Sequence, residues 1–511
     1  MAEITNTDQT GDGSLPRIAW VAFVLLAVFT YFFGLWLPFL GPDEPRYAQV
    51  AREMFERGDW ITPTLGGFTW FEKPVLLYWL EIASYNLFGV NEFAARFGPT
   101  LFGLGTILSL WILGRSISKT KAQKPNTNFA KWLALIAAST LGLIVFSRGA
   151  SFDIILTFPI TAALVAFFVY DNSTADETKT PRHLALILFY VFIGIALLAK
   201  GLVGIVFPIA IVGLNYLLTR RLPSPTFLLS LFWGTLLAGA VAAIWYVPMY
   251  VTHGWKFVDE FLIQHHFQRF TSNKYQHPQP FYFFLWVLPL MTLPWMPFFF
   301  AAIWKSVRST LWGSPDLAER PDGHSRLAAF SVAWIAVPLV FFSFSGSKLP
   351  GYILPAVPGA IVFTALTMFH LVRKSRRWTI AIYSAACAVF AVCLILLAVA
   401  LPRFADGDSL KGLIEAANER GHADERVYGL HTISHSAEFY AAKRLLRDPE
   451  GKQKKLYSPA EVAAEMQRAN VTKALVLVPP EYLKQLTDNG AVKAESIRDN
   501  GEWAIVAVSI E

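Results

Sequence analysis

Long apolar runs recur along this chain, and they constrain its fold more than any other feature. There are about eleven, each close to the roughly 20 residues that a helix needs to cross a bilayer. Within hydrocarbon, only helices and closed barrels satisfy every backbone polar group. The sequence therefore predicts an all-α polytopic membrane protein of about eleven and at most about thirteen spans. The predicted spans lie near 17–40, 96–114, 129–147, 151–170, 183–199, 201–219, 227–249, 281–304, 327–345, 350–372 and 378–401.

Charge is sparse and concentrated between these runs. Only 16% of residues are charged, whereas soluble globular chains average roughly 25%. The formal net charge of +7 resides in short loops, where it indicates topology and contact with lipid headgroups rather than nucleic-acid binding.

The segment 74–90 decides the predicted topology. It contains Glu81 and Asn86 and is amphipathic, so we expect a helix that lies in the membrane interface. Four basic loops then share one side, which the positive-inside rule makes cytoplasmic. These loops are 115–131, 220–221, 305–326 and 373–377. The opposite, periplasmic side receives loops 41–95 and 250–280, the turn at 346–350 and the C-terminal tail.

Residues 402–511 differ in composition from the rest of the chain, because charge rises and apolar runs shorten. Strands are expected at Val427–Leu430, 474–478 and 503–508, and helices at 436–446 and 459–469. Ser458, with Glu461 three residues later, has the spacing of a capping box. We expect a small soluble α/β domain, and we find no catalytic motif in it.

The first polar loop begins with two adjacent acids, Asp43 and Glu44, followed closely by Arg46. One interpretation is structural, because an acid near a helix start, with Pro45 in the first turn, stabilises that helix. The other is chemical, because a carboxylate pair at the membrane surface is suited to act as a general base. Both interpretations remain open from the residues alone.

Glu72 and Lys73 follow the aromatic pair Trp70 and Phe71. The aromatic residues indicate headgroup depth, where a lysine meets lipid phosphate. A solvated ion pair with no further role is the alternative.

Two charges occur at the ends of apolar runs, Asp153 and Lys200. An isolated charge at a helix centre costs roughly 2.5–3.5 kcal/mol and less near the ends. Lys200 can reach the interface by snorkelling, whereas Asp153 is too short to do so and is the stronger functional candidate. Arg148, five residues earlier, is the partner that we expect for Asp153.

Loop 250–280 carries a cluster of His265, His266 and Arg269. The histidines would bind a divalent metal only if a residue such as Glu72 completed the site. Arg269 has the planar fork that suits phosphate. The turn at Lys348 is flanked by glycines and also suits an anion. These cations share a predicted membrane face, whereas a transporter would place its site near the midplane.

At these residues the chain resembles the lipid A aminoarabinose transferases, which belong to the protein-O-mannosyltransferase-like group with the GT-C fold. The resemblance runs in order through about residues 17–400. It rests on the segments 41–47, 58–60, 71–79, 91–96, 151–153, 199–201, 265–270 and 347–352. Pro45 departs from the pattern, because a small residue is expected there. The family members often run longer, which leaves the sugar and the acceptor open.

The resemblance implies roles for individual residues. Asp43 would be central to catalysis, with Asp153 in support, and Lys73, Arg269 and Tyr352 would lie near the donor phosphate. It also implies an undecaprenyl-phosphate sugar donor, lipid A or a related glycolipid as acceptor, and a periplasmic site in a bacterial inner membrane.

The mechanism expected from this chemistry is a single displacement with inversion. The leaving group is already a phosphate, so cationic side chains can stabilise its charge. No cofactor is required on this view, although a divalent metal is possible. A protein O-mannosyltransferase-like enzyme and a flippase for lipid-linked sugars are the alternatives.

Overall fold

Two compact units make up the protein in a computed structural model that describes residues 14–117, 128–172, 179–268, 279–311, 323–488 and 490–510. The first unit comprises Met1–Phe33, Glu72–Leu76 and Pro99–Leu394. The second comprises Gly34–Phe71, Leu77–Gly98 and Ile395–Glu511. The domain boundary predicted between residues 401 and 402 stays a prediction.

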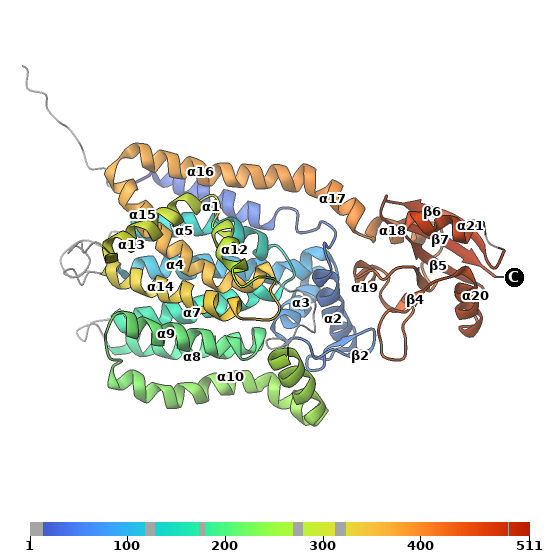
Figure 1. Ribbon diagram of the computed structural model, residues 1–511, viewed down its shortest axis with the longest axis horizontal. Helices are drawn as coiled ribbons and strands as arrows, with labels where there is room; N and C mark the ends of the chain where they lie inside the picture. Colours follow the sequence, from blue (N-terminus) through green and yellow to red (C-terminus); the bar gives the residue numbers. More distant parts are fainter. Residues whose placement is uncertain are drawn as a thin grey trace, which may run out of the picture. The chain divides into compact units, whose positions relative to one another are not determined.

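Apolar helices build the first unit, and α7, α8, α9 and α10 pack against one another within it (Figure 1). Its helices are α1 (Arg17–Phe32), α4 (Glu92–Ile117, which begins in the second unit), α5 (Asn128–Ala138), α6 (Leu141–Ser147), α7 (Phe152–Asn172), α8 (Lys179–Lys200), α9 (Val203–Leu218), α10 (Pro225–Val258), the π-helix η1 (Asp259–Gln268), α12 (Phe283–Met291), α13 (Met296–Leu311), α14 (Gly323–Ser343), the 3-10 helix η3 (Pro350–Ala356), α15 (Val357–Lys374) and α16 (Arg376–Ile395).

These helices confirm the predicted fold class. Within the described ranges, seven helices are long and apolar enough to cross a membrane, and the bent pairs α5–α6 and α12–α13 pass the same test together. The apolar helices α1 and α9 are shorter. Together they coincide with the eleven predicted regions, and the chain is a multi-pass membrane protein.

Local chemistry explains where several helices bend or end. The α5–α6 pair bends by 60° at Ser139 and Thr140, whose hydroxyls donate to carbonyls four residues back and so compete with the helix ladder. α1 ends at Phe32, well before the predicted residue 40, because Gly34 takes a positive φ of 74° that stops the helix. Gly254, with φ 57°, breaks α10 in the same way.

The segment predicted to lie in the membrane interface forms a single short helix, α3 (Leu76–Phe88). Its 13 residues are fewer than the roughly 20 that a span needs. The preceding loop contains α2 (Asp43–Arg57) and the hairpin of β1 (Thr64–Leu65) and β2 (Phe68–Thr69). α2 ends at Gly58, which adopts the left-handed conformation that favours glycine.

The C-terminal part of the second unit is built on a five-stranded sheet with order β4-β3-β5-β7-β6. β3 pairs in parallel with β4 and β5, whereas β7 is antiparallel to β5 and β6. The strands are β3 (Val427–Leu430), β4 (Lys455–Leu456), β5 (Lys473–Val478), β6 (Lys493–Asp499) and β7 (Ala504–Ser509). The helices after residue 395 are η4 (Leu396–Ala400), α17 (Leu401–Asp408), α18 (Lys411–Glu419), α19 (Ser436–Tyr440), η5 (Ala442–Arg444), α20 (Pro459–Arg468), η6 (Pro480–Tyr482) and α21 (Leu483–Thr487).

Both faces of this sheet are covered, which makes a three-layer α/β arrangement. Tyr428 and Val476 pack with Met466 of α20 in one core. Val427 and Leu475, their neighbours in sequence, pack in the core on the other face, which includes residues of α18 and α19. This alternation is the period of two that a strand imposes, and it confirms the predicted small α/β region.

Several predicted details of this region need correction. Ser458 does cap α20 by accepting from the Glu461 N–H. The helix expected at 436–446 is shorter, because α19 ends at Tyr440 and Ala442 has a positive φ of 48°. β4 and β6 were not predicted, since β4 has two residues and β6 is mostly exposed and lacks an apolar alternation.

Within the second unit, hydrogen bonds and a ring contact join the segment before α2 to the C-terminal part. The Phe39 N–H donates to the Tyr440 hydroxyl at 2.9 Å, across 401 residues of sequence. That hydroxyl donates in turn to Glu92 at 2.9 Å. The Phe39 and Phe439 rings meet edge to face with centroids 4.9 Å apart. These contacts hold the start of α2 against α19.

Candidate functional site

The start of α2 presents Asp43 as an exposed acid. Its carboxylate accepts from Arg46 Nη2 at 2.5 Å, and its side chain is 48% exposed. Arg46 also donates through Nε to the Pro42 carbonyl at 2.9 Å, which fixes the guanidinium beside the acid. No side-chain capping bond forms at this helix start. Asp43 lies in the first turn of α2, where the structural interpretation places it, and the same acid is exposed beside an arginine.

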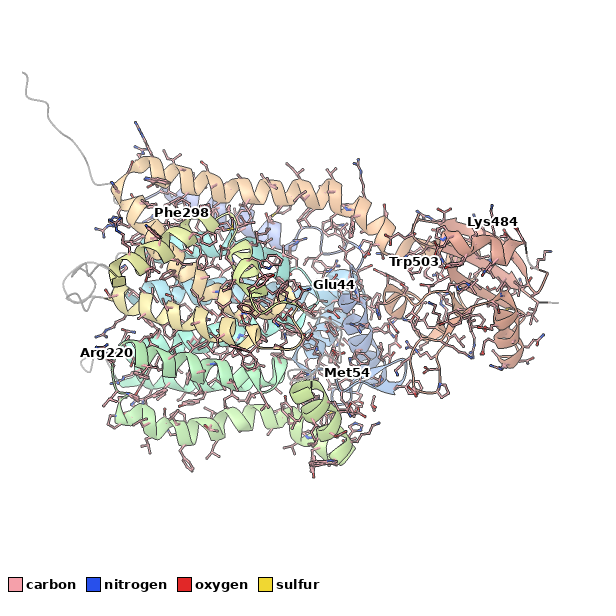
Figure 2. The ribbon with its side chains drawn as sticks, viewed as in Figure 1. Glu44, Met54, Arg220, Phe298, Lys484 and Trp503 are labelled. Atoms are coloured by element: carbon pink, nitrogen blue, oxygen red, sulfur yellow. The ribbon has the colours of Figure 1, made fainter. Side chains whose placement is uncertain are left out.

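Glu44, the next residue, lies in an opposite environment. Its two carboxylate oxygens accept from Arg96 at 3.0 and 2.7 Å, as a fork-to-fork pair. The Leu40 N–H donates to the same carboxylate at 3.1 Å. Arg96 is buried and also donates to carbonyls of the segment after α1, at Leu35, Leu37 and Pro38. Glu44, labelled in Figure 2, thus fastens the chain that leads into α2.

In the first unit, a second acid–cation cluster forms where α7 begins and α8 ends. Asp153 accepts from Lys200 Nζ at 2.5 Å. The ammonium also lies 4.8 Å from the centroid of the Tyr352 ring, within the range of a cation–π contact. Gly351 borders the acid so closely that a Cβ there would lie 1.8 Å from an Asp153 oxygen. Three predicted site residues thus come together from distant parts of the sequence.

The partner expected for Asp153 was wrong. The ion-pair partner of Asp153 is Lys200, 47 residues away, and not Arg148. Arg148 instead donates to the carbonyls of Thr30 and Tyr31 at 2.5 and 3.0 Å. Proximity in sequence suggested the wrong pair. Because the chain turns at 148–151, the side chains of Arg148 and Asp153 point in different directions although they are five residues apart.

Two further predicted cations occupy defined positions in the first unit. Lys73 donates to Glu72 at 2.9 Å, and both side chains are largely buried. Lys348 donates to the carbonyls of Ser345 and Gln279 at 2.7 and 3.0 Å. Burial lowers the pKa of Lys348. Both of these Lys348 contacts hold backbone together, so its predicted role toward phosphate stays a prediction.

The predicted metal site is not assembled by the parts that the structure describes. Arg269 lies outside the described residues, as do the side chains of His265 and His266. Among the described side chains, no group of three histidine, cysteine, aspartate or glutamate residues is placed to hold a metal ion. Glu72 is held by Lys73, and its role with the two histidines stays a prediction.

Sequence reasoning assigned no role to two residues that border the acids of α2. Arg96 appeared only as the first residue of a predicted span and the last residue of a segment in the family resemblance, although a buried arginine there required an acidic partner. His435 was unassigned, yet burial lowers its pKa, with a further contribution from Arg46 and opposing ones from Glu438 and Asp43. His435 therefore lies within electrostatic range of the Asp43–Arg46 pair, and no sequence signal indicated this.

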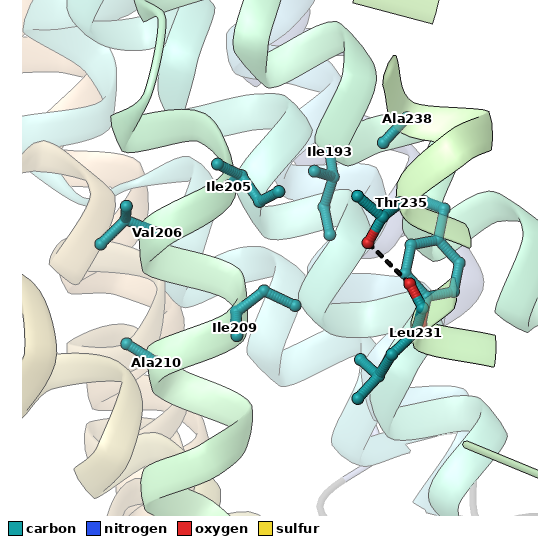
Figure 3. A pocket seen from close by; sticks show the side chains of 9 residues that line it. Ile193, Ile205, Val206, Ile209, Ala210, Leu231, Thr235 and Ala238 are labelled. Carbon is teal, nitrogen blue, oxygen red and sulfur yellow. Dashed lines mark hydrogen bonds between the residues drawn. The ribbon is translucent and has the colours of Figure 1, made fainter. Parts of the chain in front are cut away.

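A cavity among α8, α9 and α10 is mostly apolar, unlike the acid–cation clusters described above. It measures about 520 Å³ and is lined by aliphatic side chains, with Thr235 and Tyr190 as the polar exceptions (Figure 3). The Thr235 hydroxyl donates to the Leu231 carbonyl. No cation lines this cavity, so it does not suit a phosphate.

Comparisons with known proteins agree on one fold and one family. The family model for dolichyl-phosphate-mannose-protein mannosyltransferase matches residues 19–263. An undecaprenyl phosphate-alpha-4-amino-4-deoxy-L-arabinose arabinosyl transferase of Aeromonas salmonicida is 29% identical over 71% of this chain and 62% of its own length. A protein of the same name from Serratia proteamaculans is 30% identical over 67% of this chain and 58% of its own length. The chain thus spans about three fifths of these curated relatives.

Solved structures show the same fold over most of the chain. The crystal structure of ArnT from Cupriavidus metallidurans bound to undecaprenyl phosphate matches with a TM-score of 0.75 and 21% identity. The match covers 96% of this chain and 98% of that one. The Archaeoglobus fulgidus oligosaccharyltransferase matches with a TM-score of 0.55 and 14% identity, over 91% of this chain and 69% of that one.

Proposed function

Because this chain belongs to the GT-C family of the undecaprenyl phosphate-aminoarabinose transferases, we propose that it is a glycosyltransferase that uses a polyprenyl-phosphate sugar. The donor is an undecaprenyl-phosphate sugar, with aminoarabinose as the first choice. The acceptor is lipid A or a related glycolipid. The names of the relatives, and the undecaprenyl phosphate bound to the similar Cupriavidus metallidurans protein, support this assignment.

The observation that carries the proposal is the contrast between the two acids at the start of α2. Glu44 is held by Arg96, whereas Asp43 is exposed beside Arg46. A carboxylate that must meet a substrate needs this accessibility, and the neighbouring guanidinium orients it. Asp43 is therefore our choice for the acid that acts directly on the transfer step.

The reaction balances as one displacement. An acceptor oxygen forms a bond to the anomeric carbon, while the bond between that carbon and the donor phosphate oxygen breaks. Undecaprenyl phosphate leaves with the bonding electron pair, and the configuration inverts. Asp43 takes the proton if the acceptor is a hydroxyl, and it orients the acceptor if that group is already an ionised phosphate. No step requires a cofactor.

Cations would stabilise the phosphate charge that develops in this step. Lys73 and Lys200 are the described candidates, and Arg269 is proposed from its sequence position. Asp153 then holds Lys200 in place, and Tyr352 supports its ammonium. The positive-inside rule supports a periplasmic site, and the apolar helices, the type of span found in the inner membrane, support an inner-membrane location. A C-terminal alkaline phosphatase fusion should be active, and an active cytoplasmic reporter at the same point would reverse the topology.

The direct test uses the purified full chain in nanodiscs with undecaprenyl-phosphate aminoarabinose and lipid A. We expect the lipid A product to gain the mass of the sugar, and a reaction without donor serves as control. Lipid A that is unchanged while the donor is intact would overturn the assignment.

The match to the mannosyltransferase family model supports one second candidate, a protein O-mannosyltransferase. The same preparation, supplied with polyprenyl-phosphate mannose and a peptide rich in serine and threonine, separates the two. Mannosylated peptide together with unmodified lipid A would favour the second candidate.

A further inference from the structure

A cavity of about 590 Å³, lined by both charged and apolar side chains, lies within the second unit. One wall comes from the end of α2 and the turn of the β1–β2 hairpin, and the other from residues 426–448 of the C-terminal part. Its charged lining includes Glu53, Glu56, Arg57, Arg426, Lys443 and Arg447. The volume falls in the range of about 300–1,000 Å³ that is usual for small-molecule sites. The cavity contains none of the residues assigned above to the transfer step.

Hydrogen bonds to the Glu53 carboxylate fix the hairpin wall of the cavity. Glu53 is buried and accepts from the Thr64 hydroxyl at 2.7 Å and from the N–H groups of Gly66 and Gly67 at 2.6 and 3.1 Å. Gly66 has a positive φ of 63°, and a Cβ there would lie 2.1 Å from Arg447 Nε. Arg447 can approach the hairpin backbone only because this residue is glycine.

The other acids at the cavity also have their charges satisfied within the protein. Glu56 accepts from Arg52 at 2.8 Å and from Lys443 at 2.7 Å. Asp448 accepts from the N–H groups of Glu450 and Lys452, both at 2.9 Å. The carboxylates are therefore occupied within the protein, and Lys443 is the cavity cation that occupies Glu56.

Arg426 and Lys443 are less completely satisfied than Arg447, which donates to the Gly451 carbonyl and pairs with Glu438. Arg426 is exposed, and its guanidinium has no hydrogen-bond or ion-pair partner among the residues that the structure describes. Lys443 is 76% exposed, with its described ion pair to Glu56. Arg57 is 37% exposed but already paired, since it donates to the Thr62 carbonyl and the Thr64 hydroxyl and lies 3.9 and 3.8 Å from Glu53 and Asp59. A free guanidinium beside an exposed ammonium favours a phosphate or carboxylate.

We propose that this cavity binds a phosphorylated sugar of the acceptor glycolipid headgroup other than the group that reacts, with Arg426 and Lys443 as its phosphate ligands. The proposal rests on the proposed function, since it assigns the acceptor subsite of that same enzyme. The charged side chains suit sugar hydroxyls and phosphate, Phe68, Leu445 and Leu446 can pack on the apolar face of a sugar ring, and the volume accommodates a sugar phosphate. The C-terminal part, for which no catalytic motif was found, would then select the acceptor.

The kinetic test uses the full chain in nanodiscs at saturating donor with varied lipid A. Each charge-assisted contact is typically worth about 1.5–3 kcal/mol, or roughly ten- to a hundredfold. Arg426→Gln and Lys443→Gln should each raise the KM for lipid A by about tenfold or more. The kcat and the KM for the donor should change less than about twofold, and Arg426→Lys should recover part of the loss. Unchanged acceptor KM in both glutamine variants would overturn the proposal.

A matched control comes from the same part of the chain. Arg468 is 70% exposed and pairs with Glu465 on α20, and it does not line the cavity. Arg468→Gln removes one exposed positive charge of the same type. We expect it to leave the acceptor KM unchanged. If Arg468→Gln raises the acceptor KM as much as Arg426→Gln does, non-specific electrostatic attraction explains the effect, and a defined binding site in the cavity is contradicted.

A binding measurement separates this proposal from the proposed function. Glucosamine 1-phosphate and glucosamine are titrated into donor-free protein in nanodiscs, with ligand-observed NMR as the readout. We expect tighter binding of the phosphate, and loss of that preference in Arg426→Gln. If the phosphate preference is found but lipid A is never glycosylated, the proposal that the cavity binds a phosphorylated sugar is supported and the proposed transfer to lipid A is contradicted. If transfer to lipid A occurs but the variant binds both probes as wild type does, the cavity proposal falls alone.

Discussion

The start of α2 and the junction of α7 with α8 both pair an aspartate with a cation, but the two regions differ in access. Asp43 is 48% exposed beside Arg46, whereas Asp153 and Lys200 are 15% and 18% exposed. The first arrangement leaves an acid free to meet a substrate. The second holds a lysine in place between an acid and the Tyr352 ring. Similar residue types thus supply a reacting group in one region and a fixed positive charge in the other.

The largest expected effect follows from the exposed acid. Asp43→Asn keeps the size of the side chain and removes its charge and basicity. General-base loss typically costs about 10²–10⁴ in rate, so turnover should fall at least about a hundredfold. Expression and thermal stability should stay near wild type, because the side chain is half exposed and is not a cap.

Steady-state transfer to lipid A measures this loss, with Asp59→Asn as a control that removes a half-buried acid of the same loop, 34% exposed. Near wild-type turnover of Asp43→Asn would remove Asp43 from the mechanism. Attention would then move to Asp153.

The next effect concerns stability. Glu44→Ala leaves Arg96 buried without its carboxylate, and breaking a buried pair typically costs about 3–5 kcal/mol. We expect a clearly lower melting temperature in detergent and weak expression. The double variant Glu44→Met with Arg96→Met should recover part of the loss, since it removes both charges. A stable Glu44→Ala protein that lacks activity would instead make Glu44 a direct participant.

A smaller effect is expected at the fixed lysine. Lys200→Met removes one charge-assisted contact, worth about 1.5–3 kcal/mol, and should reduce kcat/KM for the donor by roughly ten- to a hundredfold. If Asp153 acts by holding Lys200, Asp153→Asn in the Lys200→Met background should cost little more. Fully additive losses in this double-mutant cycle would show that the two residues act separately.

The smallest effect is a pH-dependent one at Glu81 on α3. This side chain is fully buried, and neither carboxylate oxygen has a hydrogen-bond partner among the described residues. Burial, and then the charge of Glu44, raises the pKa of Glu81 well above its ordinary value of 4.5. Because the folded pKa exceeds the unfolded one, the cost of keeping Glu81 buried grows as pH rises above about 4.5.

Glu81→Met should therefore raise the melting temperature by a few degrees at pH 8 and by less at pH 5.5. Comparing the two melting curves in the same detergent measures the difference. A variant that is less stable at both pH values would indicate that Glu81 has a structural role as an acid.

Much of this fold could be predicted, because spans are long and apolar and β3, β5 and β7 are buried on both faces. The edge strand β6 escaped prediction, since its exposed residues carry no apolar alternation. The site was predicted as residue types and as the adjacent pair Glu72 and Lys73, but not as pairs of residues far apart in sequence. Glu44 meets Arg96 52 residues away, and Asp153 meets Lys200 47 residues away. Spacing along a sequence cannot identify such partners, because the tertiary fold brings them together.

The hydrogen bond from the Phe39 N–H to the Tyr440 hydroxyl constrains when the loop before α2 can fold during synthesis. The two residues are 401 positions apart, so the ribosome must complete most of the chain before the segment before α2 can dock. Domains generally fold as they emerge, and contacts between distant residues form late. The loop that carries Asp43 therefore docks only after Tyr440 has been synthesised. A translation product truncated before Tyr440 would insert its helices but lack this contact.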